Sequence, residues 1–174
     1  MKTSHPEVRH GLTAGFLFGI VAVSFVLIST FTNISRATWV TLHNVQGVLL
    51  VAFCLSAGFW AAHRTGRWSA AVVASTVACV LAAFLELAAQ GIVAYGFTDY
   101  LRQYPFEYYD FISSGAPTLK AYLYSGKGIY DYTWTAGVCL LFGVVFGAVV
   151  GGVAGLIRRA CGRFAIRPFS VLSV

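Results

Sequence analysis

Apolar residues gather in four long segments, and polar stretches separate them. A helix needs about 20 apolar residues to cross a hydrocarbon core of roughly 30 Å. Each of the four segments approaches or exceeds that length, so we predict an all-α, integral membrane four-helix bundle that forms a single domain over residues 1–174. The expected helices cover about residues 12–32, 45–62, 70–95 and 136–157, followed by a basic tail over 158–174.

Glycines recur at four-residue spacing in the first and the last of these segments. Such spacing leaves a smooth stripe along one helix face, and in lipid such stripes allow helix backbones to approach closely. This glycine-zipper pattern predicts that the first and fourth helices pack against each other; alternatively, one stripe faces another subunit. The glycines are Gly11, Gly15 and Gly19, and then Gly143, Gly147, Gly151 and Gly155.

Composition and charge support a membrane protein. The chain is 58% apolar and only 10% charged, whereas soluble domains have roughly 25% charged residues. Its net charge of +6 comes from residues that flank the apolar segments, which makes nucleic-acid binding a poor explanation and fits the positive-inside rule. Eight basic residues fall on one side, namely Lys2, Arg9, Arg64, Arg67, Arg158, Arg159, Arg163 and Arg167, and four on the other, Arg36, Arg102, Lys120 and Lys127. We therefore predict that both termini are cytoplasmic, in a bacterial-type inner membrane.

The first two connections are short and polar. Residues 33–44 join the first and second helices, and residues 63–68 form a tight basic turn between the second and third. So short a turn makes the second and third helices antiparallel neighbours.

The third connection, about residues 96–135, is long and rich in aromatic residues. All nine tyrosines lie between Tyr95 and Tyr132, and tyrosine favours the membrane–water interface. We expect short amphipathic helices, a turn at 113–117 and an irregular return at 125–128. The loop is either an interfacial cap over the bundle or a docking surface for a partner or ligand. The residues assigned to this surface are Tyr100, Tyr104, Tyr108, Tyr109, Phe111, Tyr122, Tyr124 and Trp134.

Glu86 is the one ionisable side chain well inside a predicted span. Such a residue is costly in hydrocarbon and indicates a functional site. Gln90 lies one turn further on the same face, and we expect this face to look inward while Leu81, Phe84 and Leu85 meet lipid. Three interpretations stay open: a neutral, structural acid; an acid that pairs with a partner subunit; and an acid that carries a proton or binds a cation.

Other candidate chemistry is sparse. The cysteines Cys54, Cys79 and Cys139 fall inside apolar segments and Cys161 follows the last one, with no metal-ligand spacing and no disulfide framework. His43 and His63 bracket the second helix, but the other spans offer no matched partners for haem. No nucleophile elbow, P-loop or zinc-protease motif is present. We therefore predict no metal, no cofactor and no enzymatic activity.

The overall pattern resembles an uncharacterised family of small bacterial four-helix membrane proteins, defined only as a domain of unknown function. The resemblance is carried by residues 9–12 (Arg-His-Gly-Leu), the short basic second connection, the long third loop and a glycine-rich last helix that ends at Arg158 and Arg159. It implies a topology but no activity and no functional residues.

For function, we expect a non-catalytic accessory or structural subunit of a larger membrane complex. Its partners would be the lipid bilayer and other membrane subunits, or a second copy. The alternative is a small proton- or cation-coupled transporter or channel centred on Glu86.

Overall fold

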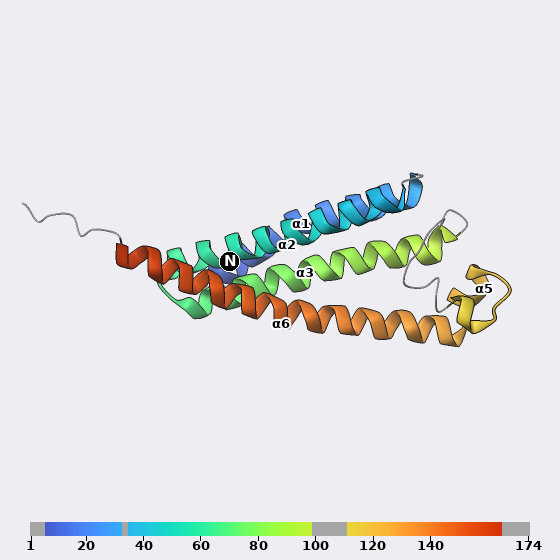
Figure 1. Ribbon diagram of the computed structural model, residues 1–174. Coiled ribbons are helices and arrows are strands. Elements are labelled where there is room, and N and C mark those ends of the chain that lie inside the picture. The colour runs from blue at the N-terminus through green and yellow to red at the C-terminus, as the bar shows by residue number, and fades with distance from the viewer. Residues whose placement is uncertain (1–5, 33–34, 99–110, 165–174) are drawn as a thin grey trace, which may run out of the picture.

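The structure is a computed structural model that describes residues 6–32, 35–98 and 111–164. Four long helices make up the body: α1 (Pro6–Phe31), α2 (Arg36–Thr65), α3 (Trp68–Gly96) and α6 (Gly126–Phe164), with the short α5 (Leu119–Leu123) at one end (Figure 1). All four long helices contain a stretch long and apolar enough to cross a membrane. The predicted all-helical bundle with four spans is confirmed.

Two helices begin well before the predicted positions. The expected connection over 33–44 is wrong for most of its length, because α2 begins at Arg36, where the Ser35 hydroxyl oxygen accepts a hydrogen bond from the Thr38 backbone N–H at 3.1 Å. The expected loop over residues 96–135, with its irregular return at 125–128, is also too long, because a helix again begins early. α6 already begins at Gly126, and the Ser125 hydroxyl accepts from the Gly128 N–H at 3.0 Å. Apolar content marks the part of a helix inside lipid, whereas capping side chains decide where the helix starts.

The turn between α2 and α3 is as tight as predicted. Gly66 ends α2 in the left-handed conformation, with φ of 67°, and its N–H donates to the Ala62 carbonyl at 2.9 Å. Glycine tolerates this conformation because it has no Cβ atom. Consequently α2 and α3 run antiparallel as neighbours.

The central helix is α3, which contacts α1, α2 and α6. Its buried residues are almost all small, and this lets neighbouring backbones come close. Along α1, Gly11 lies against Ala74 and Gly15 against Ala78, so α1 and α3 run parallel. Along α6, Gly147 lies against Thr76 and Gly151 against Val72, so α6 and α3 run antiparallel. The buried α3 residues are Ala70, Ala71, Ala74, Ser75, Ala78, Cys79, Ala82, Leu87, Ala89, Val93 and Ala94.

This arrangement corrects the expected pairing of the first and fourth helices. Both glycine stripes lie against α3, which separates α1 from α6. The expectation that Leu81 and Leu85 face lipid is wrong for a related reason. A Cβ atom at Gly15 would lie 3.0 Å from the Leu81 Cβ, and one at Gly19 would overlap Leu85 Cδ1, so both leucines pack on α1. Phe84 alone of the three is strongly exposed, at 57%.

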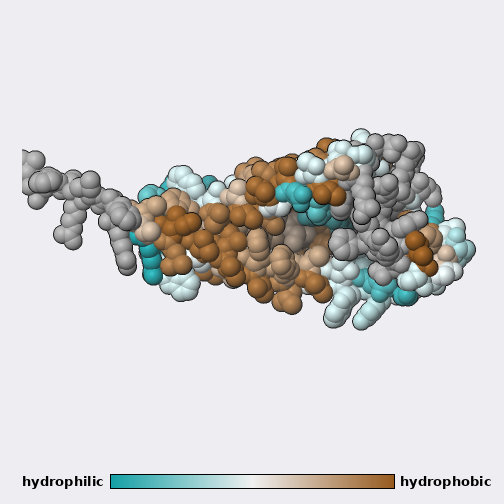
Figure 2. All heavy atoms as spheres, viewed as in Figure 1, coloured by the Kyte–Doolittle hydropathy of each residue, from teal (hydrophilic) through white to brown (hydrophobic). Residues whose placement is uncertain are grey.

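The surface divides into an apolar body with polar ends (Figure 2). Because successive long helices alternate in direction, basic residues from three helices and one turn meet at one end: Arg9, Arg64, Arg67, Arg158 and Arg159. The opposite end carries α5, Lys120, Lys127 and Asp131. Large apolar side chains such as Phe16, Leu141 and Val149 are exposed between these ends, as expected of a surface covered by lipid.

Neighbouring glycines on α6 provide a test of the close α3–α6 contact. A Cβ atom at Gly151 would lie 2.5 Å from the Ala71 carbonyl oxygen, whereas one at Gly152 would have no atom within 4 Å. Gly151→Ala should lower the stability of the bundle by about 1–3 kcal/mol through overpacking. Gly152→Ala is the matched control, since both changes gain the same helix propensity. Thermal unfolding in mild detergent measures the difference, and equal midpoints for the two variants would contradict the contact.

Candidate functional site: a polar notch at Glu86

The candidate site lies on α3 between α2 and α6. Glu86 is half-buried, and the Gln90 amide nitrogen lies 3.5 Å from its Oε1 atom, a long hydrogen bond along one face of α3. On α6, the Cys139 thiol is near enough to interact electrostatically with the Glu86 carboxylate. The structure thus brings the two predicted residues together, and it adds Cys139, which sequence analysis did not associate with them.

The surroundings of Glu86 differ sharply from those of Cys79, two turns away on the same face of α3. At Cys79 the helices touch, and its sulfur lies 2.9 Å from the sulfur of Cys54 on α2. Glu86 lies two turns after Cys79 on α3. Since α2 and α3 are antiparallel, the residue level with Glu86 on α2 is Gly47, two turns before Cys54. A Cβ atom at Gly47 would have nothing within 4 Å. Gly47 thus lies on an uncovered face of α2, whereas Gln46 beside it is only 8% exposed, so α2 still packs in the bundle at this level and the separation is between α2 and α6 (Figure 1).

The separation opens the bundle sideways. Figure 1 shows α2 moving away from α6 toward the end that carries α5. Figure 2 shows hydrophilic atoms interrupting the apolar surface in that same half of the molecule. We call this region the Glu86 notch: Glu86 and Gln90 on α3, Gly47 on α2 and Cys139 on α6. It lies about 15 Å from the end of α3, at 1.5 Å per residue, within the apolar span Trp68–Gly96.

An acid in this position needs a partner or a proton. A charge exposed to hydrocarbon is costly unless it is paired. Within the described residues, the spans carry no lysine or arginine at this depth; the basic side chains lie at the helix ends. Glu86 therefore either holds a proton or is paired with a group other than the basic side chains of the described helices.

The end of the bundle above the notch is closed by tyrosines. The Tyr132 hydroxyl of α6 donates to the Leu87 carbonyl of α3 at 2.5 Å, crossing directly over Gly91. The Tyr124 hydroxyl donates to the Tyr95 carbonyl at 2.6 Å, and the Tyr95 ring makes edge contacts with both Tyr124 and Tyr132. The Tyr132 bond fastens α6 to α3, and the Tyr124 bond fastens the turn between α5 and α6 to the end of α3.

The residues assigned to a partner-binding loop have different environments. Tyr122 is only 1% exposed and its hydroxyl donates to Asp131 at 2.8 Å, so its assignment to an outer contact surface is wrong. Phe111 is half-buried beside the Tyr122 ring. Tyr124 and Trp134 are exposed, at 56% and 65%. The other four, Tyr100, Tyr104, Tyr108 and Tyr109, lie outside the described residues.

Two further hollows mark the surface away from Glu86. One, of about 260 Å³, lies between α2 and α6 near the basic end and is lined by Leu55, Ser56, Phe59, Trp60, Ala154 and Ile157. The other, of about 300 Å³, lies along α6 and is lined by Tyr130, Thr133, Trp134, Gly137, Val138 and Leu141. Both are predominantly apolar, and Glu86 lines neither. Among the described residues no cluster of three or more His, Cys, Asp or Glu side chains could hold a metal ion.

Comparisons with protein-family models, curated proteins and solved structures give no match to this chain. They add no support for the resemblance to a family of small four-helix membrane proteins. Functional inference for this protein therefore depends on the geometry of the notch.

The opening of the notch can be tested with two glycines on one face of α2. Gly58 lies three turns from Gly47, and a Cβ atom there would lie 2.6 Å from the Ser75 hydroxyl and 3.0 Å from the Ala154 Cβ. We expect Gly58→Leu to lower the unfolding midpoint in detergent strongly, while Gly47→Leu leaves it nearly unchanged. A comparable loss for both variants would mean that Gly47 is packed against a neighbouring helix.

Proposed function

We propose that the protein is a non-catalytic accessory subunit of a membrane complex, and that a transmembrane helix of a partner subunit binds in the Glu86 notch. The observation that carries this proposal is the divergence of α2 from α6 beside Glu86, the one carboxylate of the described residues that lies far from either end of a span (Figure 1). The partner helix would present a hydrogen-bond donor, most simply a lysine or arginine side chain, to Glu86. The partner would be a different protein, since the spans of the described residues offer no basic side chain at that depth.

The shape of the notch favours a helix as the occupant. Glu86 is only half-buried, and a Cβ atom at Gly47 would have no atom within 4 Å. Glycine at such a position allows another backbone to approach closely. The Tyr132 hydroxyl bond holds α6 against α3 on the opposite side.

The proposal includes an orientation. The five described basic residues at one end of the bundle, together with the charge bias of the sequence, support cytoplasmic termini in a bacterial-type inner membrane. Glu86 would then lie in the outer half of the bilayer, on the side of α5.

A proton- or cation-coupled transporter centred on Glu86 is the competing function. Transport requires a pathway that carries the ion past the acid, usually through a polar cavity or pore. The described hollows are apolar and lie elsewhere, which favours the subunit proposal.

Substitutions at Glu86 separate the two functions. If Glu86 pairs with a partner donor, Glu86→Ala should weaken the complex by about 2–5 kcal/mol, because a buried donor is left unpaired. Glu86→Gln should weaken it less, since the amide still accepts a neutral hydrogen bond of about 0.5–1.5 kcal/mol. The measurement is the amount of partner recovered with each variant from native membranes in mild detergent. We expect most partner with the unchanged protein, less with Glu86→Gln and least with Glu86→Ala.

Phe84→Ala is the matched control, because Phe84 is on α3 two residues away and 57% exposed on another face. It should leave partner recovery unchanged. A protein that purifies alone and whose ion flux in liposomes is abolished by Glu86→Gln would overturn the subunit proposal in favour of transport.

A further inference from the structure

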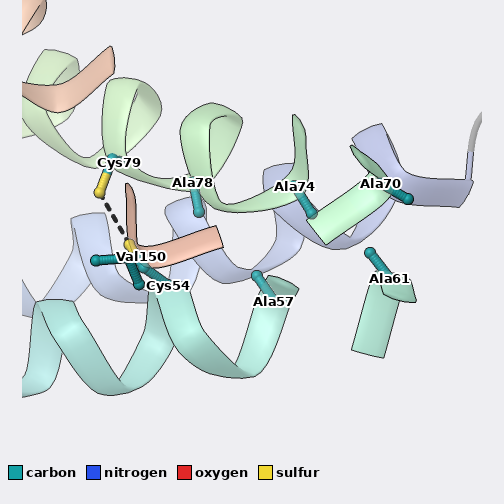
Figure 3. Close-up of a cluster of buried hydrophobic side chains, with 8 residues drawn as sticks. All are labelled: Cys54, Ala57, Ala61, Ala70, Ala74, Ala78, Cys79 and Val150. Atoms are coloured by element: carbon teal, nitrogen blue, oxygen red, sulfur yellow. Dashed lines mark hydrogen bonds between the residues drawn. The ribbon is translucent and has the colours of Figure 1, made fainter. Parts of the chain in front are cut away.

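A second chemical feature lies at the centre of the bundle, two turns from Glu86. Cys54 of α2 and Cys79 of α3 are 1% and 2% exposed, and their sulfur atoms are 2.9 Å apart (Figure 3). Both are free thiols. The two cysteines are 25 positions apart in the sequence, a spacing that matches no recognisable cysteine motif.

The backbones on either side hold the two cysteines together. The Ser75 hydroxyl of α3 donates to the Cys54 carbonyl of α2 at 2.6 Å, in the turn of α3 that precedes Cys79. The helices meet through small side chains, so few rotatable groups lie between them. The residues around the pair are Ala57, Ala61, Ala70, Ala74, Ala78 and Val150.

The sulfur separation distinguishes between two uses of a thiol pair. A metal ion bonded to both sulfurs at about 2.3 Å would hold them about 3.8–4.6 Å apart, for tetrahedral to linear geometry. At 2.9 Å no metal ion fits between them. Closure to a disulfide, with sulfurs about 2.05 Å apart, requires a movement of less than about 1 Å.

We propose that Cys54 and Cys79 are a reversible dithiol–disulfide pair that joins α2 to α3 covalently when a lipid-soluble oxidant of the quinone class is present. Two S–H bonds break and one S–S bond forms. The two electrons and two protons pass to the quinone, which becomes a hydroquinone. This proposal is independent of the subunit function, because it depends on the thiol pair and not on Glu86.

The position of the pair determines the class of oxidant. Both thiols lie within apolar spans, where charged and strongly polar oxidants are excluded. Because both sulfurs are covered in the packed bundle, a quinone ring dissolved in the lipid reaches them when the α2–α3 contact opens transiently. Disulfide formation would then hold α2 against α3 at this level.

The test uses the full chain carrying Cys139→Ser and Cys161→Ser, reconstituted in lipid nanodiscs, so that only the pair remains. The probe is decylubiquinone, because its fully substituted ring does not form a permanent covalent adduct with a thiol. After unfolding in detergent, a maleimide label counts free thiols by intact mass. We expect two labels before oxidation, none after it, and two again after dithiothreitol.

Peptide mapping identifies the bond. Trypsin cleavage after Arg36, Arg64, Arg67 and Arg102 should release peptides 37–64 and 68–102 as one linked species until they are reduced. Cys54→Ala and Cys79→Ala are the controls, and each should keep one label throughout. A membrane-anchored dithiol peptide added to the same discs is the positive control for the oxidant. If the quinone oxidises this peptide while the protein still takes up two maleimide labels, the proposal is overturned. Oxygen addition to single sulfurs in place of the linked peptide would overturn it as well.

Discussion

The close approach of helix backbones to α3 is the constraint on which the rest of the structure depends. In lipid, burying large apolar side chains against each other gains little, so contact area comes from small residues. Glycines of α1 and α6 lie directly on the alanine and serine backbone of α3, and α2 covers the seam where Ser75 bonds to its backbone. The same closeness brings two cysteine sulfurs together. Where α2 and α6 diverge, Glu86 on α3 is only half-buried (Figure 1).

The two halves of the bundle therefore have different properties. The half toward the basic end is tightly packed from Gly58 to Cys54, and the hollow on its surface between α2 and α6 is predominantly apolar. In the half toward α5, the Tyr132 hydroxyl bonds α6 to α3, while α2 and α6 diverge (Figure 1). A partner at Glu86 would bind where α2 and α6 diverge. The thiol pair lies two turns from Glu86, where a covalent bond would hold α2 against α3.

Parts of this structure follow from simple sequence rules, and other parts do not. Hydropathy predicts the four spans, and a carboxylate in a span identifies Glu86 as unusual. The glycine spacing indicates smooth faces but carries no information on which helix meets them, so the pairing of the first and fourth helices was wrong. The early start of α6 depends on a cap at Ser125 that hydropathy does not register. The meeting of Cys54 and Cys79, and the divergence of α2 from α6 beside Glu86, are tertiary properties without a local signal.

The protonation state of Glu86 tests the central claim most directly, because an acid paired with a basic partner is ionised whereas an unpaired acid in hydrocarbon is neutral. Infrared difference spectroscopy of the carboxyl band, assigned with Glu86→Gln, measures this state in native membranes and in the isolated chain in lipid. The account predicts that the Glu86 carboxyl band differs between the native complex, where a basic side chain of the partner is paired with it, and the isolated chain. An identical Glu86 band in both preparations would contradict a basic partner at the notch.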